Sequence, residues 1–171
     1  MKNKNIVLCG FMGCGKTTIG KQLAKITSME YIDIDQYIEQ QQNTTISEIF
    51  AQNGEGYFRE LEHQACNELS AKKGCVISAG GGTLLFERNV EVLKQNSTVL
   101  LLDVPLSTIK SRLHNDKKRP LLQRADKDKV MEEMYNARFP VYRSVADQII
   151  NADKSPLAVA EEIKALLKKQ Q

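Results

Sequence analysis

The 171-residue chain contains no tryptophan, and it lacks any long uninterrupted run of apolar residues. A helix that crosses a bilayer needs about 20 consecutive, mainly apolar residues. Residues 1–5 lead into the first apolar stretch without the apolar core of a signal peptide. We therefore predict a cytoplasmic protein that has no membrane partner.

Cysteine and histidine are too few and too dispersed for a zinc site. The chain has two histidines, and none of its four cysteines forms a Cys-x-x-Cys pair; they are Cys9, Cys14, Cys66 and Cys75. Structural zinc sites use closely spaced cysteine and histidine pairs. We therefore expect four reduced thiols.

A large excess of charge of one sign is also missing. The chain has 24 Lys and Arg against 21 Asp and Glu, a formal net charge of +3, and its basic residues are spread along the sequence. We expect no nucleic acid partner, because proteins that bind nucleic acid gather basic residues on one face.

The apolar content of 42% and the charged content of 26% are typical of one globular domain, here residues 1–171. Nothing suggests an obligate interface, so we expect a monomer.

The most specific pattern present is residues 10–17, GFMGCGKT, directly after the apolar run 6–9. A glycine, four residues and then Gly-Lys-Thr is the pattern of a phosphate-binding loop, whose backbone N–H groups wrap nucleotide phosphates. Lys16 can then reach the β- and γ-phosphates, and the Thr17 hydroxyl can bind Mg²⁺. An ordinary glycine-rich turn is the alternative, but the flanking strand and helix patterns favour nucleotide binding.

Apolar, β-branched runs recur along the chain and alternate with segments of helical spacing, which predicts a parallel sheet covered by helices on both faces. The expected strands are residues 6–9, 31–34, 75–78, 98–102 and 148–150. The expected helices are 17–26, one opened by a capping box at 45–48 and continuing through 50, 55–71, 106–114, 127–143 and 156–168. Pro140 should bend or interrupt its helix, and the polar stretches 40–44 and 115–124 are expected to be mobile.

Two carboxylates follow the second expected strand, at Asp33 and Asp35. Ligands bind beyond the carboxyl ends of strands in an open parallel sheet, so this pair can divide metal and substrate duties. The alternative is that Asp35 caps a helix and Asp33 merely ends the strand. Asp103 ends the fourth strand in the manner of a magnesium-binding aspartate, but a capping role is equally compatible, and we do not assign it as a metal ligand.

Three consecutive glycines, Gly80, Gly81 and Gly82, follow the third strand. Glycines are costly to order unless the backbone must approach something closely. Upstream, Arg59 and Glu62 share one helix face, where a surface ion pair would explain their spacing equally well.

Three arginines, Arg112, Arg119 and Arg138, surround or follow the polar stretch 115–124. The cluster at residues 117–119 has the composition of a solvated loop. An arginine on a lid can also stabilise charge on a transferring phosphoryl group while the closed lid excludes water. Together with the phosphate loop and two strand-end aspartates, these arginines indicate a small-molecule kinase.

In combination, these segments resemble the shikimate kinase family over nearly the whole chain. The matching segments, in the family's order and approximate spacing, are residues 10–17, 33–35, 58–62, 80–82, 119–122 and 135–142. Single segments also occur in other small P-loop kinases, but the combination is specific. The resemblance implies a three-layer α/β/α P-loop kinase fold with a five-stranded parallel sheet, a substrate-binding segment at about 34–62 and a mobile lid at 113–125.

The resemblance also implies the substrates and the residues that bind them. The reaction would be ATP-dependent phosphorylation of the 3-hydroxyl of shikimate, with Mg²⁺ as cofactor. Asp35 would orient or deprotonate that hydroxyl, and Asp33 would bind the Mg²⁺ on Thr17 through water. Shikimate contacts are expected from Arg59 and Arg138 on its carboxylate, with Glu62 holding Arg59, and from Gly80, Gly81 and Gly82. ATP contacts are expected from Gly13, Cys14, Gly15, Lys16, Thr17, Thr18, Arg112, Arg119, Lys154 and Pro156. Lys16 and Arg119 would stabilise the transferring phosphoryl group.

Two other functions remain open at this point. One is a related small kinase that acts on gluconate or a nucleoside monophosphate. The other is a nucleotide-sensing module without catalysis, in which Asp35 and the lid arginines would have no task.

Overall fold

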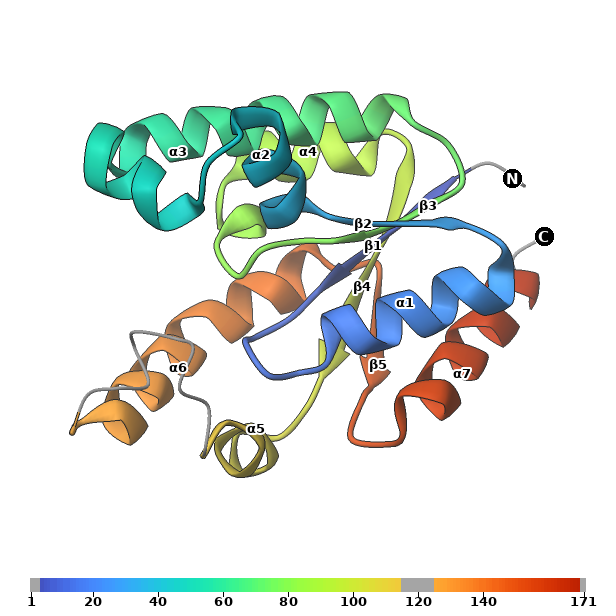
Figure 1. Ribbon diagram of the computed structural model, residues 1–171. Coiled ribbons are helices and arrows are strands. Elements are labelled where there is room, and N and C mark those ends of the chain that lie inside the picture. The colour runs from blue at the N-terminus through green and yellow to red at the C-terminus, as the bar shows by residue number, and fades with distance from the viewer. Residues whose placement is uncertain (1–3, 115–124, 170–171) are drawn as a thin grey trace.

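The computed structural model describes residues 4–114 and 125–169, and these form a five-stranded parallel sheet covered by helices (Figure 1). The strands are β1 (Asn5–Cys9), β2 (Glu30–Asp33), β3 (Cys75–Ser78), β4 (Ser97–Asp103) and β5 (Gln148–Asn151). Their order in the sheet is β2-β3-β1-β4-β5. The predicted fold class and all five predicted strands are confirmed, with shifts of one residue at some ends.

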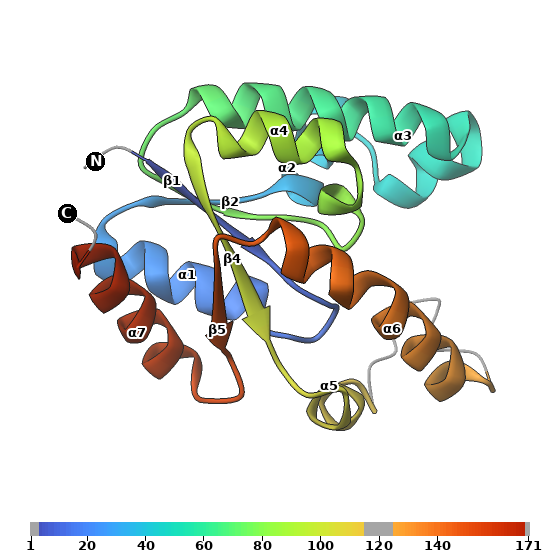
Figure 2. The ribbon, with the colours of Figure 1, turned by 180° about the vertical axis from the view of Figure 1, so that it is seen from behind.

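Helices cover both faces of this sheet, which makes three layers. They are α1 (Lys16–Thr27), α2 (Ile34–Gln42), α3 (Ile46–Ala71), α4 (Glu87–Lys94), α5 (Leu106–Leu113), α6 (Lys127–Val145) and α7 (Pro156–Lys169), with a short 3-10 helix η1 (Thr83–Leu85). Helices α1 and α7 pack together on one face, and α3 packs with α4 and α2 on the other, as the two opposite views show (Figures 1 and 2).

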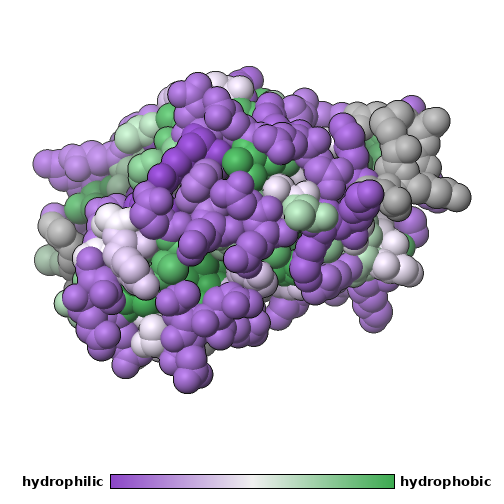
Figure 3. Space-filling model, turned by 90° about the horizontal axis from the view of Figure 1, so that it is seen from above, coloured by the Kyte–Doolittle hydropathy of each residue, from purple (hydrophilic) through white to green (hydrophobic). Residues whose placement is uncertain are grey.

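The core lies along the central strands. All residues of β1 are buried, and β4 is buried at five of its seven positions. Strands covered on both faces require such nearly continuous apolar sequences. The outer surface over α3 and α4 is mainly hydrophilic, with apolar residues visible only in small areas (Figure 3). None of the helices within 4–114 and 125–169 has the length and apolar character needed to span a membrane.

The predicted capping box begins α3. Thr45 Oγ1 accepts a hydrogen bond from the Glu48 N–H at 3.2 Å, and Glu48 Oε2 accepts one from the Thr45 N–H at 3.0 Å. The helical segment then runs to Ala71 with one non-helical residue, Gly54, at φ 79°. The two predicted helices are therefore joined across a kink, and a left-handed φ at this point suits glycine.

Several local expectations were incomplete or wrong. Pro140 lies inside α6, so an interruption at this residue is wrong, while the bend stays a prediction. Residues 40–42 of the polar stretch 40–44 belong to α2, and their mobility also stays a prediction. Helix α4 was not predicted at all. Pro105, not Asp103, is the N-cap of α5, so a capping role for Asp103 is wrong.

Candidate active site

A cavity of about 800 Å³ opens at the carboxyl ends of the strands. It is lined by the loop after β1, the start of α2, the middle of α3, the glycines after β3, and parts of α5, α6 and the segment between β5 and α7. The sequence-predicted residues within the described ranges therefore meet in one place. Arg119 and most of the expected lid lie outside the described residues.

The phosphate loop takes the backbone path that its glycines allow. Gly10, Gly13 and Gly15 have φ values of 144°, 76° and 100°. A Cβ atom at Gly10 would lie 2.7 Å from the Cys14 sulfur and 2.9 Å from the Leu102 carbonyl oxygen. Any side chain at Gly10 would therefore force this loop away from the end of β4.

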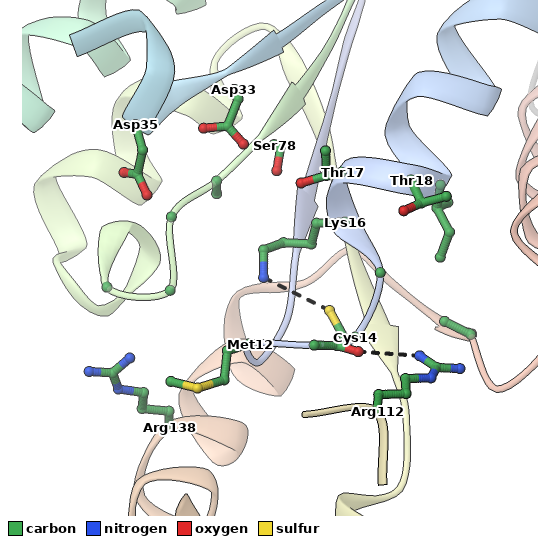
Figure 4. A pocket seen from close by; sticks show the side chains of 18 of the residues that line it. Met12, Cys14, Lys16, Thr17, Thr18, Asp33, Asp35, Ser78, Arg112 and Arg138 are labelled. Atoms are coloured by element: carbon green, nitrogen blue, oxygen red, sulfur yellow. Dashed lines mark hydrogen bonds between the residues drawn. The ribbon is translucent and has the colours of Figure 1, made fainter. Parts of the chain in front are cut away.

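Lys16 and the start of α1 supply the positive charge of the loop. Lys16 Nζ donates to the Gly10 carbonyl oxygen at 2.7 Å and to that of Phe11 at 3.3 Å. Figure 4 shows the amine pointing into the space bordered by the loop, Asp35 and Arg138. The first N–H groups of a helix have no partner within it, so those at the start of α1 are available to an anion.

Cys14 lies in the loop but turns its side chain away from solvent. The residue is 1% exposed, and its sulfur lies 3.9 Å from Lys16 Nζ. Its N–H donates to the Phe11 carbonyl oxygen at 3.2 Å. This bond stabilises the turn of the loop.

The helix cap that the sequence allowed at Asp35 is formed by Asp33 instead. Asp33 is the N-cap of α2, since its Oδ1 accepts from the Gln36 N–H at 3.2 Å, and Asp35 lies in the first turn. A helix cap at Asp35 is therefore wrong. Asp35 faces the glycines after β3, where a Cβ atom at Gly80 would lie 2.8 Å from its Oδ1.

Asp35 has an unusual electrostatic environment. Its pKa is raised from 3.8 to about 6, chiefly by burial and then by the charges of Asp33 and Glu62, while the Lys16 charge opposes the shift. A carboxyl group with a pKa near the working pH is suited to exchanging a proton with a substrate hydroxyl.

Arg59 and Arg138 reach the glycine loop from two sides. A Cβ atom at Gly82 would lie 2.8 Å from Arg59 Nη1, and one at Gly81 would lie 3.3 Å from Arg138 Nη1. Two guanidinium groups beside bare backbone can donate paired hydrogen bonds to a small carboxylate. The three glycines are thus explained by close approach of Asp35 and both arginines.

The partners of Arg59 go beyond the predicted ion pair. Nη1 contacts Glu62 Oε2 at 3.0 Å, and Nη2 contacts Glu55 Oε1 at 3.1 Å. Glu62 is 1% exposed, so this pair is not the surface ion pair that its spacing allowed. Glu55 was missed, although its i, i+4 spacing to Arg59 is a signal for such a pair.

Tyr142 is a second residue that the sequence did not single out. It is 1% exposed, and its hydroxyl donates to the Gly81 carbonyl oxygen at 2.5 Å. Burial raises the pKa of Tyr142, and the neighbouring Arg138 opposes this. Its position four residues after Arg138 places both on one face of α6, where Tyr142 binds the glycine loop and Arg138 lies beside it.

Two further basic residues, Arg112 and Lys154, line the cavity. Arg112 Nη1 donates to the Gly13 carbonyl oxygen at 3.3 Å, and its Nη2 lies 3.6 Å from Asp153. Lys154 and Pro156 line the same region, and Lys154 pairs with Glu162 at 2.9 Å. Arg112 thus lies beside the phosphate loop.

The oxygen groups near Thr17 form no complete metal cage. Among residues 4–114 and 125–169, no group of three or more His, Cys, Asp or Glu side chains could hold a metal ion. The Tyr31 hydroxyl lies beside Ser78, Thr17 and Asp33. It is buried without a hydrogen bond of normal geometry to any described residue. Thr17, Asp33 and Ser78 do line the cavity, and their side-chain oxygens suit Mg²⁺, because this ion keeps several waters and takes few protein ligands.

Comparisons with known proteins agree on one family. A family model described as shikimate kinase matches residues 12–168. The chain is 42% identical over 168 residues to a shikimate kinase of Sulfurihydrogenibium sp., covering 98% of this chain and 99% of the relative. It is 44% identical over 154 residues to one of Histophilus somni, covering 90% and 88%.

Solved structures give the same result. Shikimate kinase from Acinetobacter baumannii, in complex with shikimate, superposes with a TM-score of 0.90 at 36% identity, covering 98% of this chain and 94% of that chain. The enzyme from Aquifex aeolicus superposes with a TM-score of 0.82 at 34% identity, covering 97% of each chain.

Proposed function

Because the chain belongs to the shikimate kinase family, we propose a role for each group that lines the cavity. The reaction is the ATP-dependent phosphorylation of the shikimate 3-hydroxyl, which gives shikimate 3-phosphate and ADP in aromatic amino-acid biosynthesis. One observation carries the assignment of roles: the phosphate loop lines the same cavity as Asp35 and two arginines, which gather around the glycines after β3.

ATP occupies the loop side. Lys16 and the N–H groups at the start of α1 bind its phosphates, since a helix N-terminus and an ammonium group both favour anions there. The phosphate contacts extend over Gly13, Cys14, Gly15, Thr17 and Thr18. Arg112, Lys154 and Pro156 flank the adenine, and Arg119 of the lid segment reaches the phosphates.

Shikimate occupies the other side, with its carboxylate between Arg59 and Arg138. Two guanidinium groups can each donate paired hydrogen bonds to a carboxylate. Gly80, Gly81 and Gly82 let the ring approach the backbone, and Asp35 accepts hydrogen bonds from its hydroxyls. This orientation turns one hydroxyl toward the loop that holds the γ-phosphate.

Asp35 prepares that hydroxyl for attack. With a pKa of about 6, roughly nine tenths of the side chain is ionised at pH 7. The carboxylate aligns the hydroxyl and accepts its proton as the new O–P bond forms, which is the usual duty of an acidic residue in phosphoryl transfer. Lys16 and Arg119 stabilise the charge on the transferring group.

The residues near Thr17 fit Mg²⁺. Thr17 would bind the ion directly and Asp33 through water, while the nucleotide phosphates supply further oxygens. When bound, Mg²⁺ neutralises charge on the phosphates. We further infer a monomeric, cytoplasmic enzyme with residues 34–62 as its substrate-binding segment and 113–125 as its lid.

A comparison of acceptors tests this proposal. ADP release is measured by a coupled assay with shikimate, gluconate and a nucleoside monophosphate, each at several concentrations. We expect saturable turnover with shikimate alone. Turnover that is faster with either other acceptor, or absent with shikimate, would overturn the assignment of the site.

A further inference from the structure

A line of buried polar side chains leads from Arg59 away from the cavity. Glu62, Thr83 and Asn89 are 1%, 0% and 1% exposed, and they lie between α3, the glycine loop and α4. Burying polar groups is unfavourable unless they are hydrogen-bonded. Their presence beside the substrate site therefore calls for an explanation.

Both oxygens of Glu62 have a specific donor. Oε2 accepts from Arg59 Nη1 at 3.0 Å, and Oε1 accepts from Thr83 Oγ1 at 2.7 Å. A carboxylate held at both oxygens cannot rotate without breaking one bond. The Thr83 hydroxyl thus fixes the plane of the group on which the Arg59 guanidinium rests.

Thr83 is itself held in place from α4. Asn89 Nδ2 donates to the Thr83 carbonyl oxygen at 3.0 Å, and Asn89 Oδ1 lies 2.9 Å from His63 Nδ1. Because the amide nitrogen of Asn89 donates to Thr83, its oxygen is the acceptor, and His63 carries hydrogen on Nδ1. His63 follows Arg59 by one helical turn, so the bonds form a closed circuit through α3.

The Arg59 guanidinium has little space in which to move. A Cβ atom at Gly82 would lie 2.8 Å and 2.9 Å from its two terminal nitrogens. Its guanidinium further lies over the Phe86 ring, 4.9 Å from the ring centroid. Rotation toward the loop would bring the group against the Gly82 backbone, and rotation away would withdraw it from the carboxylate site.

We propose that Thr83 and Asn89 are positioning residues for shikimate binding, which act through Glu62 on the direction of Arg59 without touching the substrate. This inference rests on the proposed role of Arg59. Paired hydrogen bonds from a guanidinium to a carboxylate depend strongly on geometry, and small misplacements of a binding group reduce activity. Loss of the Thr83 hydroxyl should therefore weaken shikimate recognition and leave the ATP side unchanged.

The test compares two substitutions at one position. Thr83→Val keeps the shape of the side chain but removes its hydroxyl, and Thr83→Ser keeps the hydroxyl. We expect Thr83→Val to raise the KM for shikimate about tenfold, with the KM for ATP and kcat changed less than twofold, and Thr83→Ser to stay within twofold throughout. Thr27→Val is the matched control, because its hydroxyl donates to the Leu23 carbonyl oxygen at the far end of α1.

A double-variant cycle separates this inference from the proposed function. In an Arg59→Ala background, Thr83→Val should change kcat/KM for shikimate less than twofold, since the group it positions is gone. Normal kcat/KM in Arg59→Ala alone would refute the role of Arg59. Three results would refute only the positioning role. In the first, Arg59→Ala lowers kcat/KM for shikimate but Thr83→Val does not. In the others, Thr83→Val lowers it equally with and without Arg59, or lowers kcat/KM for ATP as much as that for shikimate. Asn89→Ala, expected to raise the same KM about threefold, decides the question if Thr83→Val does not fold.

Discussion

The raised pKa of Asp35 implies that this carboxylate costs folding free energy at neutral pH. Its pKa moves from 3.8 to about 6 in the folded protein, chiefly through burial. At pH 7 the side chain is ionised in both states, and the folded state disfavours that ionised form. A difference of about two units corresponds to about 3 kcal/mol. Replacing Asp35 by the neutral Asn should therefore stabilise the fold by up to about 3 kcal/mol at pH 7.

Because the folded state raises the pKa of Asp35, the stabilisation of the fold by Asp35→Asn should disappear in acid. As the pH falls through 6, Asp35 in the folded state becomes protonated and its cost is relieved. At pH 4, just above the unfolded pKa, the remaining difference between wild type and Asp35→Asn is about 0.5 kcal/mol. At pH 7 the midpoint of thermal unfolding should rise by roughly 6–12 °C for a domain of this size.

The assay is urea unfolding of wild type and Asp35→Asn at pH 7 and pH 4, accompanied by steady-state kinetics at pH 7. We expect kcat of the variant to fall by orders of magnitude while the KM for ATP changes little, because only the group at the attacking hydroxyl is lost. A variant that is no more stable than wild type at pH 7, or equally stabilised at both pH values, would refute the electrostatic argument. Near-normal turnover would refute the catalytic role of Asp35.

Three further predictions concern the acceptor side of the cavity. Arg59→Ala should raise the KM for shikimate at least tenfold with the KM for ATP unchanged, because half of the carboxylate site is removed; equal KM values would exclude Arg59 from the site. Gly82→Ala should weaken shikimate binding at least fivefold in calorimetry, because its Cβ would lie 2.8 Å from Arg59 Nη1. The control is Gly56→Ala, which has open space around the added Cβ and should leave binding unchanged. Equal effects of the two substitutions would show that the space beside Arg59 is unimportant. Shikimate affinity measured without nucleotide should fall about tenfold from pH 7 to pH 5 as Asp35 gains a proton, and the same decline in Asp35→Asn would assign it to another group.

The sheet and the phosphate loop were predictable because their signals are local. Strands buried on both faces are nearly continuous apolar runs, as residues 6–9 of β1 are, and the glycines of the loop occupy left-handed conformations. The pattern around Thr45 fixed the start of α3 for the same reason. These features depend on neighbours within a few residues of the chain.

The missing parts of the site depend on contacts between distant segments. Tyr142 meets Gly81 across 61 positions, and Glu62 meets Thr83 across 21, so no local pattern marks either pair. Asp33 and Asp35 are equally good caps by composition, and only the point at which the chain turns into α2 decides between them. Helix α4 is eight residues long, too short for its periodicity to stand out, and its N-cap, Phe86, is not a capping residue type. Helix α5 is equally short but is marked by Pro105 at its start.

The register of the central strands has a consequence for how the two substrates meet. Leu8 pairs with Ser78, and the Ala79 N–H donates to the Leu8 carbonyl oxygen at 3.0 Å. The loop for the phosphate donor and the loop for the acceptor thus leave neighbouring strands at the same height. Adjacent strands lie about 4.8 Å apart, so the pairing of β1 with β3 sets the distance between the donor loop and the acceptor loop. Substitutions in the surrounding helices can therefore change which acceptor fits without changing the distance between these two loops.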